Sequence, residues 1–362
     1  MKVVLMHDWL TGFRGGERVL EAFCEMFPDA PIYTLIHQKG SVPASIENRE
    51  IKTSFLNHIP GIEKHYRKFL PLFPMAAESL KITEKADLVL SSSHCVIKGV
   101  KKPTGSKHIS YIHSPMRYLY DQYDSYFGPD APWYQRFGMR VFRDYLTNWD
   151  IASNRNVDVS IANSNFVKKR ISTYYGKDSE VVNPFVDLAD FSGVSLDGPR
   201  DYYLMVTAFA PNKRVDVAIR AFNENGKKLK IIGSGQKEAE LRALAGENIE
   251  FLGNLDRSHV IKEFLGARAF IFPGVEDFGI TPLESLACGT PVIAYKVGGV
   301  LETLNDEVSH FFEGGGSEDL VYAINEFEKR VFDRTKLVAR AEQFSKKRFI
   351  ANINKVIAKT IL

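Results

Sequence analysis

Two carboxylates in the second half of the chain could hold the hydroxyl groups of a ligand. Glu276 and Glu284 lie on either side of a short segment that contains Gly279. The apolar run 269–272 predicts a buried strand that ends just before Glu276. Gly279 would let the backbone approach a ligand closely. The spacing therefore indicates a loop that could bind a polar ligand, and an ordinary solvated carboxylate at Glu276 is the alternative.

A helix is expected to begin directly after this loop. Thr281 and Glu284 have the spacing of a capping box, with Pro282 at the first helical position. The backbone N–H groups in the first turn of a helix have no partner within it, so an anion could bind there. Under the simplest alternative, Glu284 only closes the capping box.

Two adjacent cations, Lys213 and Arg214, precede another predicted helix. They follow the expected strand 202–206 and stand before the apolar pattern of residues 217–222. Cations at the start of a helix oppose its dipole, which argues against a purely structural role. On a diphosphate leaving group, both would stabilise the negative charge that develops as the bond breaks.

Polar residues of the first half also follow expected strands. Gly15 and Gly16 come after the strand 3–7, but without the spacing of a dinucleotide-binding loop, so a plain tight turn is the alternative. His113 stands at the end of the strand 108–112, where open α/β sheets place ligand sites. A hydrogen-bonded structural histidine is the alternative there.

The stretch from Glu276 to Glu284, followed by Ala287-Cys288-Gly289-Thr290-Pro291, resembles the E-x7-E signature of group 1 (family 4) retaining glycosyltransferases. The resemblance implies an α/β GT-B fold, in which two Rossmann-like doubly wound domains face a central cleft and the C-terminal helix crosses back to the first domain. It extends over most of the chain, through Gly15-Gly16, His113 to Tyr118, and residues 162–167, 183–187 and 341–345.

Four residues are expected to be catalytic, Glu276 and His113 from the resemblance and Lys213 and Arg214 from the charge argument above. Glu276 would bind hydroxyls of the donor sugar, and His113 would touch hydroxyls beside the reacting carbon. Lys213 and Arg214 would hold the phosphates. The departing phosphate itself would accept the proton of the acceptor during front-face attack, so no protein base would be needed.

Further residues would bind the donor or the acceptor. Glu284 would hold the ribose diol. Other donor contacts would come from Gly15, Gly16, Phe278, Gly279, Ile280, Thr281 and Leu283. Asp8 and Arg117 are acceptor-side candidates on position alone.

One departure from the family pattern lies at Ala208. Family members usually carry an arginine there in a Gly-Arg-Leu step, whereas this chain has Thr207-Ala208-Phe209. Either Arg214 supplies the missing guanidinium or the phosphate site is weaker than usual. The departure keeps open a catalytically silent subunit that only binds nucleotide sugars. A hydrolase or an epimerase of sugar nucleotides on the same fold is a second enzyme alternative. The epimerase is the less well supported of the two, because no second acid is evident at the anomeric carbon.

Composition limits the other possibilities. The 362 residues fit two domains, and 47 basic against 44 acidic residues give no field suited to nucleic acid. Three separate cysteines in apolar surroundings, Cys24, Cys95 and Cys288, indicate buried thiols and a cytoplasmic location. We expect neither a signal peptide nor a membrane span. The sequence contains no Asp-x-Asp and no metal-ligand cluster, which predicts a metal-independent enzyme without a cofactor.

Apolar runs alternating with helical patterns predict parallel sheets covered by helices. We expect an N-terminal acceptor-side domain at 1–185, a linker at 186–199, a nucleotide-sugar domain at 200–344 and a returning helix at 345–362. In addition to those above, strands are expected at 32–36, 51–55, 87–92, 157–162, 229–232, 249–252 and 291–295.

The expected reaction transfers a hexose to a hydroxyl of a lipid-linked or cell-envelope glycan. The His-Asp-Trp-Leu opening and the segment after His113 resemble bacterial O-antigen mannosyltransferases, which favours GDP-mannose, with UDP-glucose nearly as well supported. Lys64, Arg67 and Lys68 alternate with apolar residues, which predicts weak contact with an anionic membrane surface. An ordinary helix packed on its own domain is the alternative.

Overall fold

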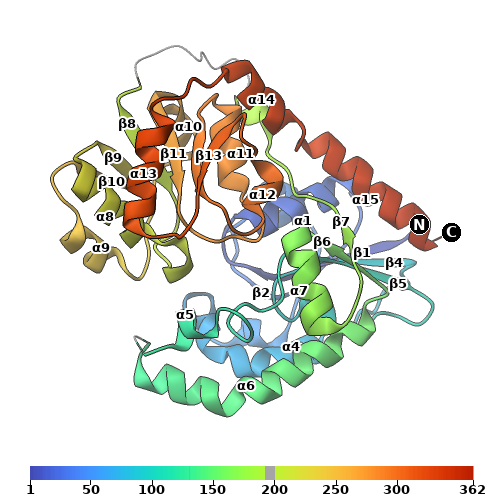
Figure 1. Cartoon of the computed structure of the whole chain (residues 1–362). Coiled ribbons are helices and arrows are strands. Elements are labelled where there is room, and N and C mark those ends of the chain that lie inside the picture. Colours follow the sequence, from blue (N-terminus) through green and yellow to red (C-terminus); the bar gives the residue numbers. More distant parts are fainter. Residues whose placement is uncertain (130, 192–199, 362) are drawn as a thin grey trace. The chain divides into compact units, whose positions relative to one another are not determined.

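A computed structural model describes residues 1–129, 131–191 and 200–361 of the chain. The chain divides into two compact units: Met1–Asn183 with Ile350–Leu362, and Pro184–Phe349. Figure 1 shows both units with most of their elements labelled. Residues 192–199 of the predicted linker lie outside the described residues, and the predicted domain limits stay predictions.

The first unit is built on a parallel seven-stranded sheet in the order β3-β2-β1-β4-β5-β6-β7. Its strands are β1 (Val3–Leu10), β2 (Ile32–His37), β3 (Ile51–Thr53), β4 (Leu88–Ser93), β5 (Lys107–Ile112), β6 (Val159–Ala162) and β7 (Glu180–Val181). Seven of the eight residues of β1 are buried, as expected for a central strand covered on both faces.

Helices connect these strands. They are α1 (Gly15–Met26), α2 (Ala44–Glu47), α3 (Ile62–His65), α4 (Phe73–Ser79), α5 (Tyr123–Phe127), α6 (Trp133–Ser153) and α7 (Asn165–Tyr175). The last helix, α15 (Lys346–Ile361), begins in the second unit, and its residues from Ile350 onward belong to the first. Lys359 of α15 forms an ion pair with Glu180 of β7, Nζ to Oε1 3.1 Å. The end of the chain thus returns to the first unit, as predicted.

The second unit is built on a parallel six-stranded sheet in the order β10-β9-β8-β11-β12-β13. Its strands are β8 (Tyr202–Val206), β9 (Leu229–Ile232), β10 (Ile249–Gly253), β11 (Ala267–Phe272), β12 (Val292–Tyr295) and β13 (Ser309–Phe312). Its helices are α8 (Val215–Asn225), α9 (Glu238–Leu244), α10 (Arg257–Gly266), α11 (Ile280–Ala287), α12 (Val300–Thr303), α13 (Ser317–Phe327) and α14 (Arg334–Glu342).

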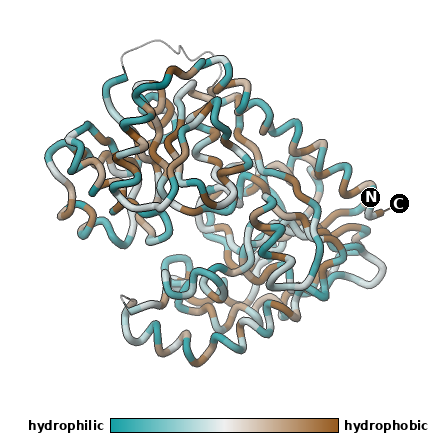
Figure 2. Tube along the Cα trace, in the orientation of Figure 1, coloured by the Kyte–Doolittle hydropathy of each residue, from teal (hydrophilic) through white to brown (hydrophobic). Residues whose placement is uncertain are grey.

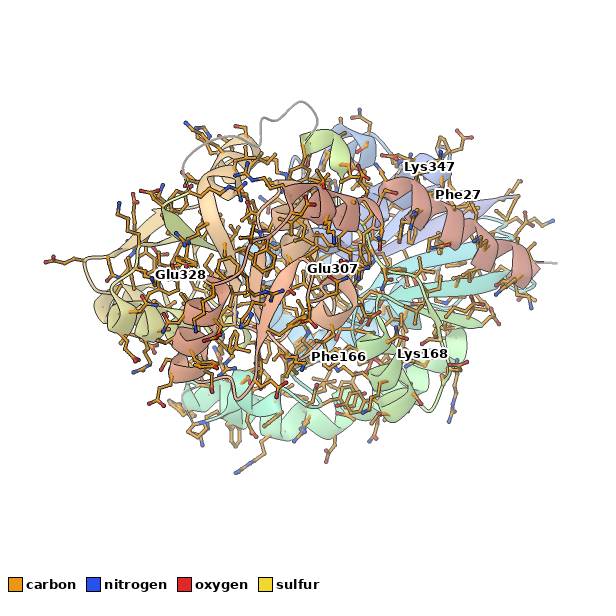
Figure 3. All side chains as sticks on the ribbon, turned by 45° about the horizontal axis from the view of Figure 1, so that its top comes forward. Phe27, Phe166, Lys168, Glu307, Glu328 and Lys347 are labelled. Atoms are coloured by element: carbon orange, nitrogen blue, oxygen red, sulfur yellow. The ribbon has the colours of Figure 1, made fainter. Side chains whose placement is uncertain are left out.

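Apolar residues gather along the strands of each sheet (Figure 2). In the second unit, two core clusters take alternate residues of β8, which places them on the two faces of its sheet. At one edge of this packing, Glu328 follows α13 (Figure 3). It accepts hydrogen bonds from the Tyr203 hydroxyl at 3.0 Å and from the Lys227 ammonium at 2.8 Å. These bonds tie the end of α13 to β8 and to the turn after α8.

The structure confirms two parallel-sheet Rossmann-like domains. The sequence patterns did not predict two strands, β7 and β13. Both lie at a sheet edge, and β7 is only two residues long. The three cysteines are free and buried, as predicted. Burial raises the pKa of Cys24 and of Cys288 to about 12, so both thiols stay protonated. Within the described ranges, none of the helices is both long and apolar enough to cross a bilayer.

Candidate functional site

The structure brings Lys213 and Glu276 together at the carboxyl ends of β8 and β11. Lys213 ends a short 3-10 helix, Pro211–Lys213, that follows β8, and Glu276 lies in the loop after β11. Their side chains form an ion pair between Nζ and Oε1, and each is about one-fifth exposed. A small pocket lined by both residues and by Thr207 lies beside them. The pair therefore presents one cation and one carboxylate at the edge of the sheet where parallel α/β folds bind ligands.

Glycines allow the loops around this ion pair to approach one another. A Cβ atom on Gly274 would lie 2.8 Å from the Asn212 carbonyl oxygen and 2.9 Å from the Lys213 Cα. A Cβ atom on Gly299 would lie only 2.0 Å from the Asp277 carbonyl oxygen. The Gly299 N–H instead donates to the Glu276 carbonyl at 2.8 Å. Because neither glycine carries a side chain, the backbone on both sides of Glu276 can make these close contacts.

The helix after this loop begins earlier than the sequence predicts. Its N-cap is Gly279, with φ of 91°, and α11 starts at Ile280. Thr281 is therefore inside the first turn, and the predicted capping box between Thr281 and Glu284 is wrong. The glycine reaches a left-handed conformation that threonine would adopt only at a cost, which explains why it ends the loop.

The Glu284 carboxylate is held by an arginine that the sequence analysis did not single out. Arg257 donates from Nη1 to Glu284 Oε1 at 2.7 Å and from Nε to Asp190 Oδ2 at 3.0 Å. Burial alone would lower the pKa of Arg257, but the two carboxylates raise it. A usable signal was present, because Arg257 opens α10 and is a cation at a helix start, like Lys213.

The other predicted donor residues of the second unit lie around the start of α11. The side chains of Phe278 and Leu283 are buried in the core, so they can offer a ligand only backbone groups. Ile280 and Thr281 form the first turn of α11. The N–H groups of a first turn have no helical acceptor, as the predicted amide contacts require.

Arg214 lies next to Lys213 but is held differently. Among the described residues, it is the one non-glycine residue with positive φ, at 53°. Its guanidinium donates to the Gly315 carbonyl and lies 5.2 Å from the centre of the Tyr295 ring. Its role toward phosphate stays a prediction, as does the idea that it replaces the arginine missing at Ala208.

A second glycine-dependent loop adjoins Ala208. Gly233 follows β9 with φ of 137°, and a Cβ atom there would lie 1.8 Å from the Thr207 carbonyl oxygen. Phe209 donates its N–H to the Ser234 carbonyl at 2.9 Å. The chain therefore fixes the loop at Ala208 by backbone contacts. The Gly233-Ser234-Gly235 sequence directly after an expected strand could have identified this loop.

In the first unit, the predicted residue His113 belongs to a chain of hydrogen bonds. Its Nε2 lies 2.8 Å from the Ser92 Oγ, which lies 3.1 Å from Nδ1 of His7. The Nε2 of His7 is 3.7 Å from Oε1 of Glu17, at the start of α1. These side chains come from the carboxyl ends of β1, β4 and β5 and from the helix after β1. Ser92 thus couples the proton positions on the two imidazoles.

Gly16 permits this arrangement. A Cβ atom on Gly16 would lie 3.3 Å from Cε1 of His7 and 3.7 Å from Nε2 of His113. The start of α1 therefore packs directly against both rings. Gly15 is the first residue of α1. The predicted donor contacts of both glycines stay predictions.

Burial sets the protonation of these groups. Desolvation, helped by the nearby charge of His94 and His7, holds the pKa of His113 well below its usual value. Burial acts to raise the pKa of Glu17, but hydrogen bonding and attraction from His7 outweigh it and lower that pKa to about 2. His113 is therefore a neutral ring at neutral pH, while Glu17 is ionised.

The two predicted acceptor-side residues, Asp8 and Arg117, differ in burial. The Asp8 carboxylate is fully buried and accepts hydrogen bonds from the backbone N–H groups of residues 94–97, at 2.7 to 3.0 Å. It therefore shapes the loop after β4, and any effect on an acceptor would act through that loop. Arg117 lies half-buried after β5, in the same unit. Its acceptor role stays a prediction.

The predicted site residues thus form two groups, one in each unit. In the described parts of the chain, no group of three or more His, Cys, Asp or Glu side chains could hold a metal ion.

Comparisons with known proteins match both units. The model described as glycosyl transferases group 1 matches residues 189–347, and the one described as Glycosyltransferase Family 4 matches residues 13–190. With the two parallel sheets, these matches define a glycosyltransferase of the GT-B class. The chain belongs to the group 1 glycosyltransferases.

Individual relatives are distant. An uncharacterised glycosyltransferase of Methanocaldococcus jannaschii is 26% identical over 84% of this chain and 83% of its own length. The alpha-1,3/1,6-mannosyltransferase of Saccharomyces cerevisiae is 28% identical over 50% of this chain and 47% of its own.

Solved structures show the same fold. Sucrose-phosphate synthase of Thermosynechococcus elongatus has a TM-score of 0.72 at 16% identity and covers 99% of both chains. Anabaena HepE in complex with UDP and glucose has a TM-score of 0.70 at 17% identity, also over 99% of both.

Proposed function

We propose that this protein transfers a hexose, with mannose from GDP-mannose as the first candidate, to a hydroxyl of a lipid-linked or cell-envelope glycan, with retention at the anomeric carbon. The observation that carries the proposal is the Lys213–Glu276 ion pair beside the start of α11. One cation and one carboxylate side by side match the two parts of a nucleotide sugar, the diphosphate and the sugar hydroxyls.

Each residue group has a distinct task in this proposal. Lys213, with Arg214 and the first-turn amides of α11, stabilises the charge that develops on the departing diphosphate. Glu276 orients the sugar, and Glu284, fixed by Arg257, accepts the ribose hydroxyls. His113 is a neutral hydrogen-bonding ring for the sugar. No metal or cofactor takes part.

The choice of donor rests on relatives. Mannosyltransferases occur among them, including the yeast enzyme and a GDP-mannose-dependent enzyme of Corynebacterium glutamicum that is 38% identical over 25% of this chain. UDP-glucose is the second candidate, because Anabaena HepE with the same fold is described in complex with it. The acceptor is proposed to be lipid-linked, which would place the protein at the cytoplasmic face of the cell membrane.

A donor panel tests this proposal. The purified protein is incubated with GDP-mannose, UDP-glucose and ADP-glucose, together with glycolipid extracted from the source cells, and the released nucleotide and the product anomer are measured. We expect release of GDP that depends on the glycolipid and an α-linked product. Nucleotide binding without release from any donor would overturn the transferase and favour a silent binding subunit.

A further inference from the structure

The long helix α6 carries an unusual row of exposed aromatic and aliphatic side chains. Trp133, Phe137 and Val141 are spaced by four residues and are 76%, 64% and 56% exposed. Tyr134 and Tyr145 lie beside them, at 56% and 42%. We call these five residues the aromatic stripe. Large apolar side chains that lie together in water mark a surface that binds something else.

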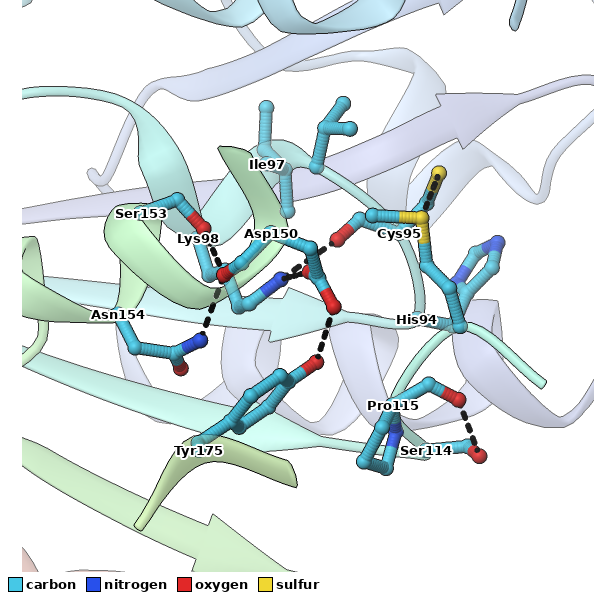
Figure 4. A network of polar contacts seen from close by, with 12 residues as sticks. His94, Cys95, Ile97, Lys98, Ser114, Pro115, Asp150, Ser153, Asn154 and Tyr175 are labelled. Carbon is cyan, nitrogen blue, oxygen red and sulfur yellow. Dashed lines mark hydrogen bonds and ion pairs between the residues drawn. The ribbon is translucent and has the colours of Figure 1, made fainter. Parts of the chain in front are cut away.

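The opposite side of α6 is firmly attached to the first unit. Met139, Leu146 and Asp150 are buried. Figure 4 shows the polar contacts at its C-terminal end. The Asp150 carboxylate forms an ion pair with the buried Lys98 and accepts a hydrogen bond from the Tyr175 hydroxyl at 2.9 Å. The aromatic stripe is therefore the outer side of a helix that is anchored in the fold.

Cations line one edge of the stripe. Arg136 and Arg140 are exposed and lie one turn apart along α6. On the exposed side of the helix, Asp144 supplies one negative charge. Aromatic residues next to arginines on one exposed helix face are typical of helices that lie in the interface of an anionic bilayer.

We propose that the aromatic stripe of α6 docks on the surface of an anionic lipid bilayer, with Trp133 and Phe137 entering the interface and Arg136 and Arg140 meeting lipid phosphates. A second copy of the chain fits less well. Two stripes facing each other would bring the arginine rows of both copies together, and like charges oppose such an interface.

The basic stretch around Lys64, Arg67 and Lys68 is a weaker candidate for this contact. Its three cations are exposed, but Tyr66 and Phe73 are buried and the apolar residues between them pack against the core. The alternative interpretation, a segment packed on its own domain, describes it better. These cations could add only long-range attraction, whereas α6 offers side chains that can insert.

The inference does not depend on the transfer reaction, so vesicle binding tests it separately. The full chain is mixed with phosphatidylglycerol-containing vesicles or with pure phosphatidylcholine vesicles, at low and at physiological ionic strength, and sedimented. We expect binding to the anionic vesicles alone, weakened by salt. Trp133 is the most exposed of the three tryptophans, so its fluorescence should shift to the blue on binding.

Three variants test whether the aromatic stripe and its arginines bind the vesicles. The double variant Arg136→Gln/Arg140→Gln should weaken binding about 25-fold, because each cation near the surface strengthens binding roughly fivefold. Trp133→Ser/Phe137→Ser should reduce binding at least as much. Trp133→Phe should still bind but lose the blue shift. The matched comparison is Lys64→Gln/Arg67→Gln/Lys68→Gln, which should bind more tightly than either double variant.

Specific results would overturn the proposal. These are no binding to anionic vesicles, binding that both α6 double variants leave unchanged, or loss of binding only in the triple variant. A dimer seen by light scattering that Trp133→Ser/Phe137→Ser dissolves, without vesicle binding, would assign the stripe to a second copy. Thermal unfolding and nucleotide binding serve as folding controls, because the second unit is untouched in every variant.

Discussion

The polar groups of the two units are organised in opposite ways. In the first unit, His7, Ser92 and His113 are joined through one hydroxyl, and burial keeps His113 neutral. In the second, Lys213–Glu276 and Arg257–Glu284 are ion pairs with partly exposed side chains. A buried hydrogen-bonded relay fixes orientation and has few alternative arrangements. Partly exposed ion pairs keep full charges available to a charged ligand, so we expect the second unit to dominate affinity and the first to set orientation.

The largest effect should come from the cation of the second unit. Lys213→Ala should lower kcat/KM about 10- to 150-fold, because a charge-assisted bond to phosphate is worth about 1.5 to 3 kcal/mol. Initial rates with the sugar donor measure this. Lys296→Ala is the matched control, since Lys296 pairs with Glu313 at 2.6 Å on the exposed surface of the same unit. Equal rates in the two variants would remove Lys213 from the phosphate site.

The next prediction concerns the folding stability that Glu17 of the first unit contributes. The pKa of Glu17 is lowered from 4.5 to about 2 in the folded protein. Its ionised form therefore stabilises the fold above the unfolded value, and that contribution is lost as the pH falls from 4.5 toward 2. Glu17→Gln should cost on the order of 2 kcal/mol at neutral pH, and the difference from wild type should shrink in acid.

Urea unfolding at a series of pH values down to about 3 measures this difference. Glu25→Gln on the same helix is the control, because Glu25 is exposed. A Glu17→Gln penalty that stays constant with pH would show that packing of the side chain, and not its charge, stabilises α1.

Substitutions of Glu284 and Glu276 in the second unit should impair different steps, nucleotide binding and sugar transfer respectively. Glu284→Gln should weaken binding of the bare nucleoside diphosphate about tenfold, since a carboxylate accepts ribose hydroxyls better than an amide does. Glu276→Gln should leave that affinity nearly unchanged and lower turnover of the nucleotide sugar, because in the proposed function only the sugar meets that carboxylate. Calorimetric titration and initial rates measure the two effects.

Arg257 sharpens the test, because it holds the Glu284 carboxylate. Arg257→Gln should reproduce the binding loss of Glu284→Gln. Unfolding midpoints control for the broken ion pair in both variants. Equal loss of diphosphate affinity in Glu276→Gln and Glu284→Gln would falsify the assignment of sugar to one and ribose to the other.

The smallest expected effect is that of metal chelation, which should not change turnover. In the proposed function, Lys213 supplies the positive charge that a divalent cation would otherwise bring to the diphosphate, so turnover should be unchanged by EDTA. Rates are compared before and after chelation and after addition of Mg²⁺ or Mn²⁺. If chelation abolished turnover and either metal restored it, charge neutralisation by Lys213 would be insufficient.

Much of the fold could be predicted from the sequence, because buried parallel strands are short apolar runs between helical patterns. All eleven expected strands are present, with small shifts at their ends. β7 and β13 were missed. Two residues of β13 are half-buried and two are buried, so this strand lacks the continuous apolar run of the central strands.

The candidate site was harder to predict where contacts join distant residues. The pairing of Lys213 with Glu276 depends on Gly274 and Gly299, whose close backbone approaches have no local sequence signal. The partnership of Arg257 with Glu284 joins the first residue of α10 to a residue in the middle of α11, and the two lie far apart in the sequence. The capping box failed for a local reason, because Gly279 can begin the helix in a conformation unfavourable for threonine.

The left-handed backbone at Arg214 has a consequence for the evolution of this loop. A non-glycine residue in that conformation costs roughly 1 to 2 kcal/mol, which glycine would avoid. Selection for stability alone would therefore favour Arg214→Gly, a change that removes the contacts with Gly315 and Tyr295. The arginine thus places a guanidinium at a fixed position at a cost in folding free energy, and strained backbone of this kind is common at functional sites.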